Sequence, residues 1–179
     1  MLEREMTGRR AFSGRQQRVS HSGSQKQLSA ALGRLPSGLF VLTARRDQSE
    51  TGMLTSWVQQ CAFEPPVLSV AIKQGRPVIP WLTEGSRFTL NILDDSQTDM
   101  VAHFGRGFAL GEPAFEEVEI ERPPDGALVL AEALAYLQCT VEKCFPIGDH
   151  QLILASVTGG RLLGEGQPMV HIRKSGMHY

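Results

Sequence analysis

The fold is organised around one continuous stretch in the first half of the chain, Gly52-Met53-Leu54-Thr55-Ser56-Trp57-Val58-Gln59-Gln60-Cys61-Ala62-Phe63-Glu64-Pro65-Pro66. It begins as an apolar strand edge, becomes polar and aromatic, and closes on two prolines, directly before the β-forming run 67–72. Tight hairpin turns use Gly, Asn and Asp, whereas this segment carries hydroxyl and amide groups beside a tryptophan. We therefore interpret it as a polar loop between two strands that suits a polar aromatic ligand. The alternative is a long surface loop whose Trp57 is simply packed.

Strand-like runs recur at short intervals along the chain. They cover residues 39–44, 67–72, 87–93, 135–145, 151–162 and 169–172. The run 87–93 alternates as a half-buried strand, and 135–145 and 151–162 flank one short turn, which predicts a hairpin. About six or seven strands with two or three short helices favour a mainly β antiparallel barrel over βαβ winding. No Gly-rich dinucleotide fingerprint follows the first strand, which excludes a Rossmann fold.

Cap signatures predict where the helices begin. Ser24-Gln25-Lys26-Gln27 resembles a capping box with Ser24 as the N-cap, and Gly33 lies where that short helix would stop. Ser96-Gln97-Thr98-Asp99 is a second signature and predicts another helix. In the loop-rich segment that follows it, Phe115 is the expected anchor in the core. Residues 127–133 fit either a helix or a strand.

The totals describe a globular chain of 179 residues with 41% hydrophobic residues and a formal net charge of -1. Neither nucleic acid nor a membrane surface is indicated by that charge. The sequence contains no run of about 18 apolar residues, so it predicts no transmembrane helix. The first residues lack the apolar core of a secretory signal. We therefore expect a cytoplasmic protein. Residues 1–23 are arginine-rich and aperiodic, which predicts a disordered or loosely held tail before a single domain at 24–179. A transit-like segment, or a contact with an acidic partner, is the alternative for that tail.

The cysteines and histidines do not predict a metal site. An odd number of cysteines, Cys61, Cys139 and Cys144, fits a reducing compartment, and we expect Cys139 and Cys144 to be buried or half-buried thiols. His171 and His178 have a spacing that matches no known set of metal ligands. We therefore expect no metal.

The sequence contains few candidate catalytic residues. No G-x-S-x-G elbow, H-E-x-x-H pair or Walker loop is present. His103 falls within the second predicted helix and is interpreted as a helix-end residue. His150 follows Gly148-Asp149 at a strand entrance, where the ligand loops of barrels gather; the alternative is a turn with an exposed imidazole. A chain without nucleophile, metal or acid pair must take its chemistry from a cofactor.

A phosphate-binding position is predicted at Lys73-Gln74-Gly75-Arg76-Pro77. Pro77 fits the first turn of a helix that Pro80 limits to about a turn or two. Two basic side chains just before the free N–H groups of a helix start could bind a phosphate. A solvated pair of basic residues is the alternative.

Residues Leu35 to Tyr179 resemble the flavin reductase family with the FMN-binding split-barrel fold. The motifs that carry this resemblance are Pro36-Ser37-Gly38, Thr55-Ser56-Trp57-Val58, Pro65-Pro66, Gly75-Arg76, 88–93, His103-Phe104 and Gly148-Asp149-His150. A closer similarity, to the flavin reductase module at the C-terminus of cyanobacterial-type flavodiiron proteins, rests on Ser56-Trp57-Val58, Phe63-Glu64-Pro65-Pro66, 132–137 and Arg173-Lys174-Ser175-Gly176.

The resemblance implies an antiparallel Greek-key split β-barrel with a few short helices, assembled as a homodimer with FMN near the subunit interface. It implies that Thr55, Ser56 and Trp57 line the flavin ring and ribityl chain, and that Gln60, Lys73 and Arg76 approach the phosphate. The flavin-binding residues it implies are Ser37, Gly38, Thr55, Ser56, Trp57, Gln60, Lys73 and Arg76. His150 is the implied catalytic residue, near the ring or the nicotinamide.

The function that follows is an NAD(P)H:flavin oxidoreductase, which transfers hydride from NADH or NADPH to FMN. The alternative is a non-enzymatic FMN-binding electron carrier that serves an electron-acceptor protein. A third interpretation is a ligand-free barrel used for interaction. Thr55-Ser56-Trp57 together with Gly75-Arg76 favour the first two.

Overall fold

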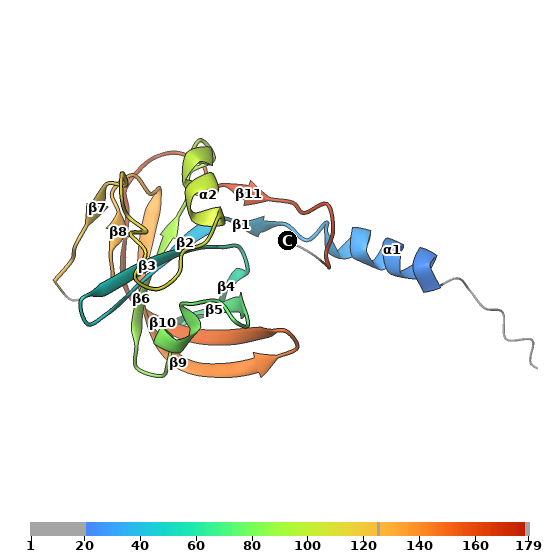
Figure 1. Cartoon of the computed structure of the whole chain (residues 1–179), viewed down its shortest axis with the longest axis horizontal. Helices are drawn as coiled ribbons and strands as arrows, with labels where there is room; N and C mark the ends of the chain where they lie inside the picture. Colours follow the sequence, from blue (N-terminus) through green and yellow to red (C-terminus); the bar gives the residue numbers. More distant parts are fainter. Residues whose placement is uncertain (1–20, 125, 178–179) are drawn as a thin grey trace, which may run out of the picture.

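The computed structural model describes residues 21–124 and 126–177 and is built mainly from β-strands (Figure 1). Its helices are α1 (His21–Leu32), the 3-10 turn η1 (Ile79–Trp81) and α2 (Thr98–Gly105). Its strands are β1 (Ser37–Gly38), β2 (Phe40–Arg46), β3 (Ser49–Thr55), β4 (Val58–Phe63), β5 (Pro66–Lys73), β6 (Arg87–Ile92), β7 (Ile120–Glu121), β8 (Val129–Leu130), β9 (Ala135–Ile147), β10 (His150–Leu162) and β11 (Val170–His171).

Seven of the strands form one antiparallel sheet in the order β3-β2-β6-β9-β10-β5-β4. The two outermost strands, β3 and β4, are consecutive in the sequence and are joined only by Ser56 and Trp57. The sheet must therefore curl until its two edges approach each other at this link. No ladder pairs β3 with β4 among the described strands, so the barrel is split along that seam. This confirms the predicted mainly β split barrel.

The polar stretch that follows Trp57 is a strand, and its interpretation as a loop was wrong. Residues of β4 pair antiparallel with β5, from Val58 opposite Val70 to Phe63 opposite Pro66, with a bulge at Cys61. Because β4 is an edge strand, its glutamines and Cys61 are exposed to solvent, so polar side chains cost nothing there. Val58 at its start packs against the core, but the exposed polar residues that follow give no apolar alternation, so the sequence pattern suggested a loop.

Two helix starts also differ from their predictions. α1 begins at His21, so Ser24 lies inside the helix and is not its N-cap, although the helix stops directly before Gly33 as expected. α2 begins at Thr98 after the N-cap Gln97, whose side chain makes no capping hydrogen bond. The predicted tail at 1–23 lies outside the described residues except for its last three, which belong to α1.

Strand β6 is buried on both faces, which corrects its prediction as a half-buried strand. Phe88 and Leu90 are buried on one side, and Thr89 and Asn91 on the other. The polar pair is accommodated by hydrogen bonds: Thr89 Oγ1 donates to the Ala127 carbonyl at 3.0 Å, and Asn91 Nδ2 donates to the Val41 carbonyl at 3.0 Å. These bonds offset the cost of burying polar groups.

Two apolar clusters hold the barrel together. The first fills the barrel around residues such as Leu42, Val70 and Phe88. The second lies beneath α2 and includes Phe104, with Phe115 packed against it, which confirms Phe115 as the anchor of the loop-rich segment.

The predicted hairpin is present, and it is longer than expected. β9 and β10 pair along their full lengths around a turn of only Gly148 and Asp149. Gly148 has a φ of +55°, which glycine adopts readily. At the other end of the chain, β11 pairs with β1 as a separate two-stranded sheet. No helix within 21–124 and 126–177 is long and apolar enough to cross a bilayer.

The three cysteines differ sharply in accessibility, and this gives a first prediction. Cys61 is exposed, Cys139 is buried, and Cys144 is intermediate; burial raises the pKa of the Cys139 thiol to about 12. Because the thiolate is the reacting species, an alkylating reagent should label Cys61 at least about 100-fold faster than Cys139 in the native protein. Peptide mass spectrometry after timed alkylation checks this, and rapid native labelling of Cys139 would contradict the barrel packing.

Candidate functional site

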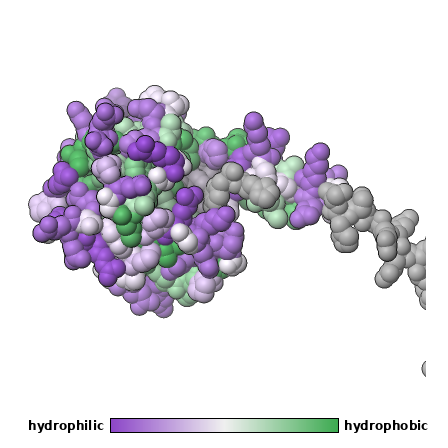
Figure 2. Space-filling model, viewed as in Figure 1, coloured by the Kyte–Doolittle hydropathy of each residue, from purple (hydrophilic) through white to green (hydrophobic). Residues whose placement is uncertain are grey.

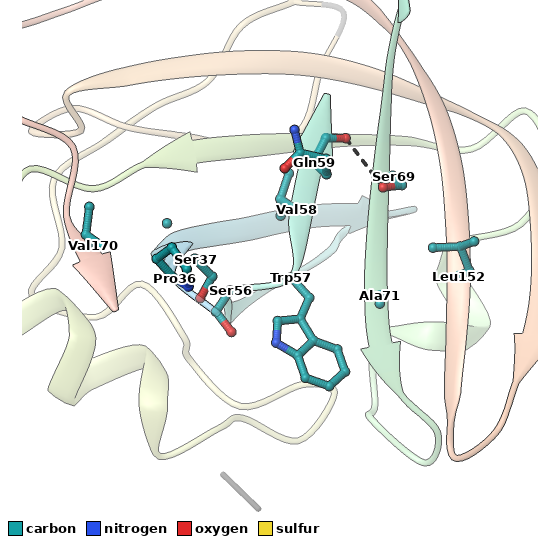
Figure 3. A pocket seen from close by; sticks show the side chains of 11 residues that line it. Pro36, Ser37, Ser56, Trp57, Val58, Gln59, Ser69, Ala71, Leu152 and Val170 are labelled. Atoms are coloured by element: carbon teal, nitrogen blue, oxygen red, sulfur yellow. Dashed lines mark hydrogen bonds between the residues drawn. The ribbon is translucent and has the colours of Figure 1, made fainter. Parts of the chain in front are cut away.

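Two adjoining cavities lie at the seam between β3 and β4. The first, of 450 Å³, is lined by Pro36, Ser37, Gly38, Ser56, Trp57, Val58, Gln59, Ser69, Ala71, Leu152 and Val170 (Figure 3). The second, of 240 Å³, is lined by Leu39, Met53, Leu54, Thr55, Ser56, Ala71, Ile72, Lys73, Arg76, Val101, Phe104, Gly105 and His171. The two share Ser56 and Ala71, so the link between β3 and β4 stands where one cavity meets the other.

The first cavity lies on the outer face of the sheet. Ser69 and Ala71 alternate along β5 with the core residues Val70 and Ile72, and alternate residues of a strand face opposite sides. The paired strands β1 and β11 supply the opposing wall. On that wall, Ser37 Oγ is buried and has no hydrogen-bond partner in the described part of the chain.

The second cavity carries the positive charge of the site. Lys73 ends β5, and Arg76 follows it in a turn where the Arg76 N–H donates to the Lys73 carbonyl at 3.3 Å. No acidic side chain is among the described residues that line this cavity. The helix expected after Pro77 is a single 3-10 turn that begins at Ile79. The cationic side chains, and not a helix terminus, therefore supply the attraction for an anion.

His150 lies beside Trp57 and is not an exposed turn residue, which excludes that alternative. Its residue is 7% exposed, and its ring stacks on the indole with centroids 4.7 Å apart and planes 27° apart. Its Nδ1 lies 2.7 Å from Asp149 Oδ1. This hydrogen bond is the main cause of the lowered pKa of the Asp149 carboxyl, and nearby Lys73 contributes.

Sheet pairing explains why His150 lies beside Trp57, a lining residue of the first cavity, although His150 itself lines neither cavity. His150 opens β10 and is paired with Lys73, the last residue of β5. The β9–β10 turn therefore sets the histidine next to the start of the cationic turn. Sequence spacing alone could not show this, because Lys73 and His150 are far apart along the chain.

Most of the predicted flavin-binding residues line the two cavities. Ser37, Gly38, Ser56 and Trp57 line the first, and Thr55, Ser56, Lys73 and Arg76 line the second. Gln60 lines neither: it is exposed on β4, and its side-chain amide donates to the Ala62 carbonyl at 3.2 Å. The neighbouring Gln59 lines the first cavity instead, because adjacent residues of a strand face opposite sides.

Arg173 and His171 were missed as site residues. The Arg173 guanidinium lies over the Trp57 ring, 4.8 Å from its centroid, a favourable cation–π arrangement. His171 lines the second cavity. The Arg173-Lys174-Ser175-Gly176 motif was the only signal in the sequence that pointed to this segment. His103 lies within α2, and its Nε2 is 2.9 Å from the Ala114 carbonyl oxygen.

The chain belongs to the flavin reductase like domain family, whose profile matches residues 32–178. It is similar to "Putative diflavin flavoprotein A 3" of Synechocystis sp., with 42% identity over 150 residues that cover 83% of this chain and 25% of that protein. It is also 36% identical to "Diflavin flavoprotein A 1" of the same organism, covering 85% of this chain and 27% of that protein. The chain thus spans about a quarter of the length of these relatives.

Solved structures give the same family. The styrene monooxygenase flavin reductase SMOB of Pseudomonas putida S12 is similar with a TM-score of 0.68 and 27% identity, over 80% of this chain and 90% of that chain. The NADH:FAD oxidoreductase SgcE6 of Streptomyces globisporus C-1027 has a TM-score of 0.75 at 24% identity, over 84% and 87%, and shows the shared fold. These findings confirm the resemblance to the flavin reductase family and to the reductase module of flavodiiron proteins.

Proposed function

We propose that this chain is an NAD(P)H:flavin oxidoreductase that binds FMN across the two cavities at the seam. One observation carries the proposal: a cavity lined by a tryptophan and hydroxyl groups joins, through Ser56, a cavity lined by Lys73 and Arg76. Such an arrangement matches a molecule with a planar ring at one end and a phosphate at the other. Membership of the flavin reductase family supports a flavin as the ligand.

The residues present fit a flavin mononucleotide. The first cavity, of 450 Å³, lies within the range of about 300–1,000 Å³ found for small-molecule sites, and the adjoining cavity of 240 Å³ adds to it. The Ser37 hydroxyl on the wall of the first cavity is buried and has no partner among the described residues. It could hydrogen-bond a polar edge of the flavin ring, since a buried polar group without a hydrogen bond costs free energy. Lys73 and Arg76 would hold the phosphate, and Thr55 and Ser56 would face the ribityl chain.

The bound flavin supplies the reactive chemistry, as the acceptor of a hydride from a nicotinamide. The protein positions the reacting groups. Asp149 accepts a hydrogen bond at His150 Nδ1, which fixes the tautomer at that nitrogen and, together with the Trp57 stack, the orientation of the ring. We propose His150 as the residue that orients the nicotinamide.

We further propose that the protein is a cytoplasmic homodimer. Val170 lines the first cavity and is 63% exposed, and Ile172 and Leu35 nearby are also largely exposed. Apolar side chains are visible along the neck between the barrel and α1 (Figure 2). A second copy laid on this region would remove them from water and close the flavin cavity. Light scattering should then give twice the chain mass of 19.7 kDa.

A direct test measures FMN-dependent oxidation of NADH and of NADPH by the purified protein. The proposal predicts rapid oxidation of at least one nicotinamide that depends on added or bound FMN. A protein that binds FMN and turns yellow but oxidises neither nicotinamide would instead be an electron carrier for an acceptor protein. A protein that stays colourless with FMN would overturn both.

Replacing His150 with alanine should affect turnover more than FMN binding. We expect kcat to fall about tenfold, or about 1.4 kcal/mol of transition-state free energy, because the oriented imidazole beside Trp57 is lost. FMN affinity should change less than threefold. Unchanged kcat in steady-state assays would leave His150 as a packing residue. Asp149→Asn tests whether the hydrogen bond to His150 Nδ1 orients the imidazole, and this variant should also lower kcat.

A further inference from the structure

Two further cavities adjoin each other on the outer face of the barrel and have no role in the function proposed above. One, of 350 Å³, is lined by Arg45, Asp47 and Arg87 and by the chain around Gly126. The other, of 240 Å³, shares Arg87 and Gly126 with it and adds the polar side chains Gln138, Thr140 and Thr158. We call the two together the distal hollow, because the turn between β2 and β3 that borders it lies on the side of the barrel opposite α1 (Figure 1).

The distal hollow is separate from the cavities at the seam. β2 begins at Phe40, which is paired with Thr55 of the second cavity, and Arg45 is five residues further along the same strand. A strand rises about 3.3 Å per residue, so Arg45 lies about 17 Å along the sheet from that pair. A ligand in the distal hollow would therefore leave the flavin site open.

Two guanidinium groups come together in the distal hollow from neighbouring strands. β2 and β6 pair through Ala44 and Phe88, which belong to the apolar cluster inside the barrel. The next residues on the two strands are Arg45 and Arg87, and both line the same cavity. Because consecutive residues of a strand face opposite sides, the two arginines share the outer face. Like charges on facing positions destabilise a strand pair, and an anion held between them would replace that repulsion with two charge-assisted contacts.

The protein's own acidic groups do not neutralise this pair. Arg45 Nε donates to the Asp47 carbonyl oxygen at 3.2 Å, and Arg45 forms no ion pair with another described residue. Glu50 is paired with Arg45 across β2 and β3, but its carboxylate is bound by Arg122 at 3.1 Å. Asp47 is the one acidic residue among the described residues that line the hollow. Two guanidinium groups against one carboxylate leave one net positive charge.

The second part of the hollow presents neutral hydrogen-bonding groups in fixed positions. The Gln138 amide lies between two glycines: a Cβ on Gly126 would be 2.8 Å from Gln138 Nε2, and a Cβ on Gly159 would be 2.8 Å from Gln138 Oε1. A larger residue at either position would displace the amide. Thr158 Oγ1 donates to the Gln138 backbone carbonyl at 3.2 Å, which fixes the hydroxyl beside the amide. Amide and hydroxyl groups of this kind match the hydroxyl groups of a small polar molecule.

We propose that the distal hollow binds a small phosphate monoester, with the phosphate between Arg45 and Arg87 and the hydroxylated body over Gln138 and Thr158. A phosphate monoester carries about -1.5 to -2 charges at pH 7 and three strong acceptor oxygens, so it can accept from two guanidinium groups at once. A carboxylate has a single charge and two oxygens, which match one guanidinium group better than two. The larger cavity, of 350 Å³, is within the range of about 300–1,000 Å³ for small-molecule sites.

The test titrates glycerol 3-phosphate into the whole chain by calorimetry, with and without saturating FMN. We expect binding that FMN does not displace and that Arg45→Gln weakens at least tenfold. Arg46→Gln is the matched control: it removes the same charge from the next residue, whose guanidinium donates to the Pro80 carbonyl at 3.3 Å, and binding should stay within twofold. Gln138→Leu keeps both arginines and should weaken binding about threefold, so the site is tested even if Arg45→Gln loosens the strand pair.

Asp47→Asn gives a prediction of the opposite sign. It removes the carboxylate that opposes an anion, and asparagine tolerates the φ of +55° at this position. Binding of glycerol 3-phosphate should therefore become at least threefold tighter, a gain that a loosened fold could not produce. Unchanged or weaker binding by Asp47→Asn would contradict the proposed position of the phosphate.

Four other results would overturn the proposal. They are absence of binding to the wild type, equal weakening by Arg45→Gln and Arg46→Gln, displacement of the probe by FMN, and tighter binding of citrate than of glycerol 3-phosphate. Displacement by FMN, together with loss of binding in Arg76→Ala, would place the probe at the seam. Tighter binding of citrate would make the hollow a carboxylate site. None of these results depends on oxidation of a nicotinamide, so the proposed reductase activity stands or fails separately.

Discussion

Replacing Arg76 with alanine is expected to weaken FMN binding by about 2 kcal/mol, or about 30-fold, while riboflavin binding changes less than threefold. Arg76 lines the second cavity with Lys73 and forms no ion pair with another described residue. Its guanidinium is thus available for a dianionic phosphate, which FMN has and riboflavin lacks. Titrations of flavin fluorescence with both ligands measure the two affinities.

Arg46→Ala is the matched control for this prediction. Arg46 is an exposed cation of β2 and lines neither cavity at the seam, so its removal changes the net charge equally without touching the site. FMN affinity should then stay within twofold of wild type. If Arg76→Ala weakens FMN and riboflavin binding equally, Arg76 does not contact the phosphate. If Arg46→Ala weakens FMN binding as much as Arg76→Ala does, the effect comes from the net charge of the protein and not from a contact at the site.

Phe104→Ala is expected to destabilise the fold by about 3–5 kcal/mol, the range for truncating a buried phenylalanine. Phe104 is 1% exposed on the inner side of α2 and belongs to the second apolar cluster. It also lines the cationic cavity, so the variant should lose FMN affinity as that wall collapses. Urea unfolding followed by circular dichroism measures the loss of stability.

Phe63→Ala removes the same atoms from a residue that is 87% exposed on β4. Its cost should stay within about 0.5 kcal/mol, as for other surface substitutions. Similar costs for the two phenylalanines would contradict the packing of α2 on the barrel. If Phe104→Ala is destabilised but keeps its full FMN affinity, then Phe104 supports the fold and does not shape the FMN site.

The barrel could be predicted because its inner strands carry strong local patterns. The hairpin of β9 and β10 shows as two long β-forming runs around Gly148-Asp149, and β2 and β5 show as short apolar runs. β4 could not be recognised, because after Val58, which packs against the core, its polar residues are exposed and show no apolar period. β6 was recognised as a strand, but its second buried face was not, since Thr89 and Asn91 are buried through hydrogen bonds that depend on distant segments.

The site was predictable only where its residues are close in sequence. Thr55, Ser56 and Trp57 form one motif, and Lys73 and Arg76 form another, so each could be recognised as a unit. The stacking of His150 on Trp57 and the placement of Arg173 over the indole depend on strand register and on the return of the C-terminal segment. The choice between Gln59 and Gln60 depended on knowing that β4 is a strand, because only then do the two side chains face opposite sides.

Anaerobic stopped-flow mixing of the FMN-loaded protein with NADH, and separately with NADPH, tests the central claim most directly. A flavin bound at the seam and served by His150 should lose its visible absorbance with at least one nicotinamide, and Arg76→Ala should lower the amplitude at limiting FMN. A wild-type protein that binds FMN yet keeps its full flavin absorbance with both nicotinamides would contradict the reductase function.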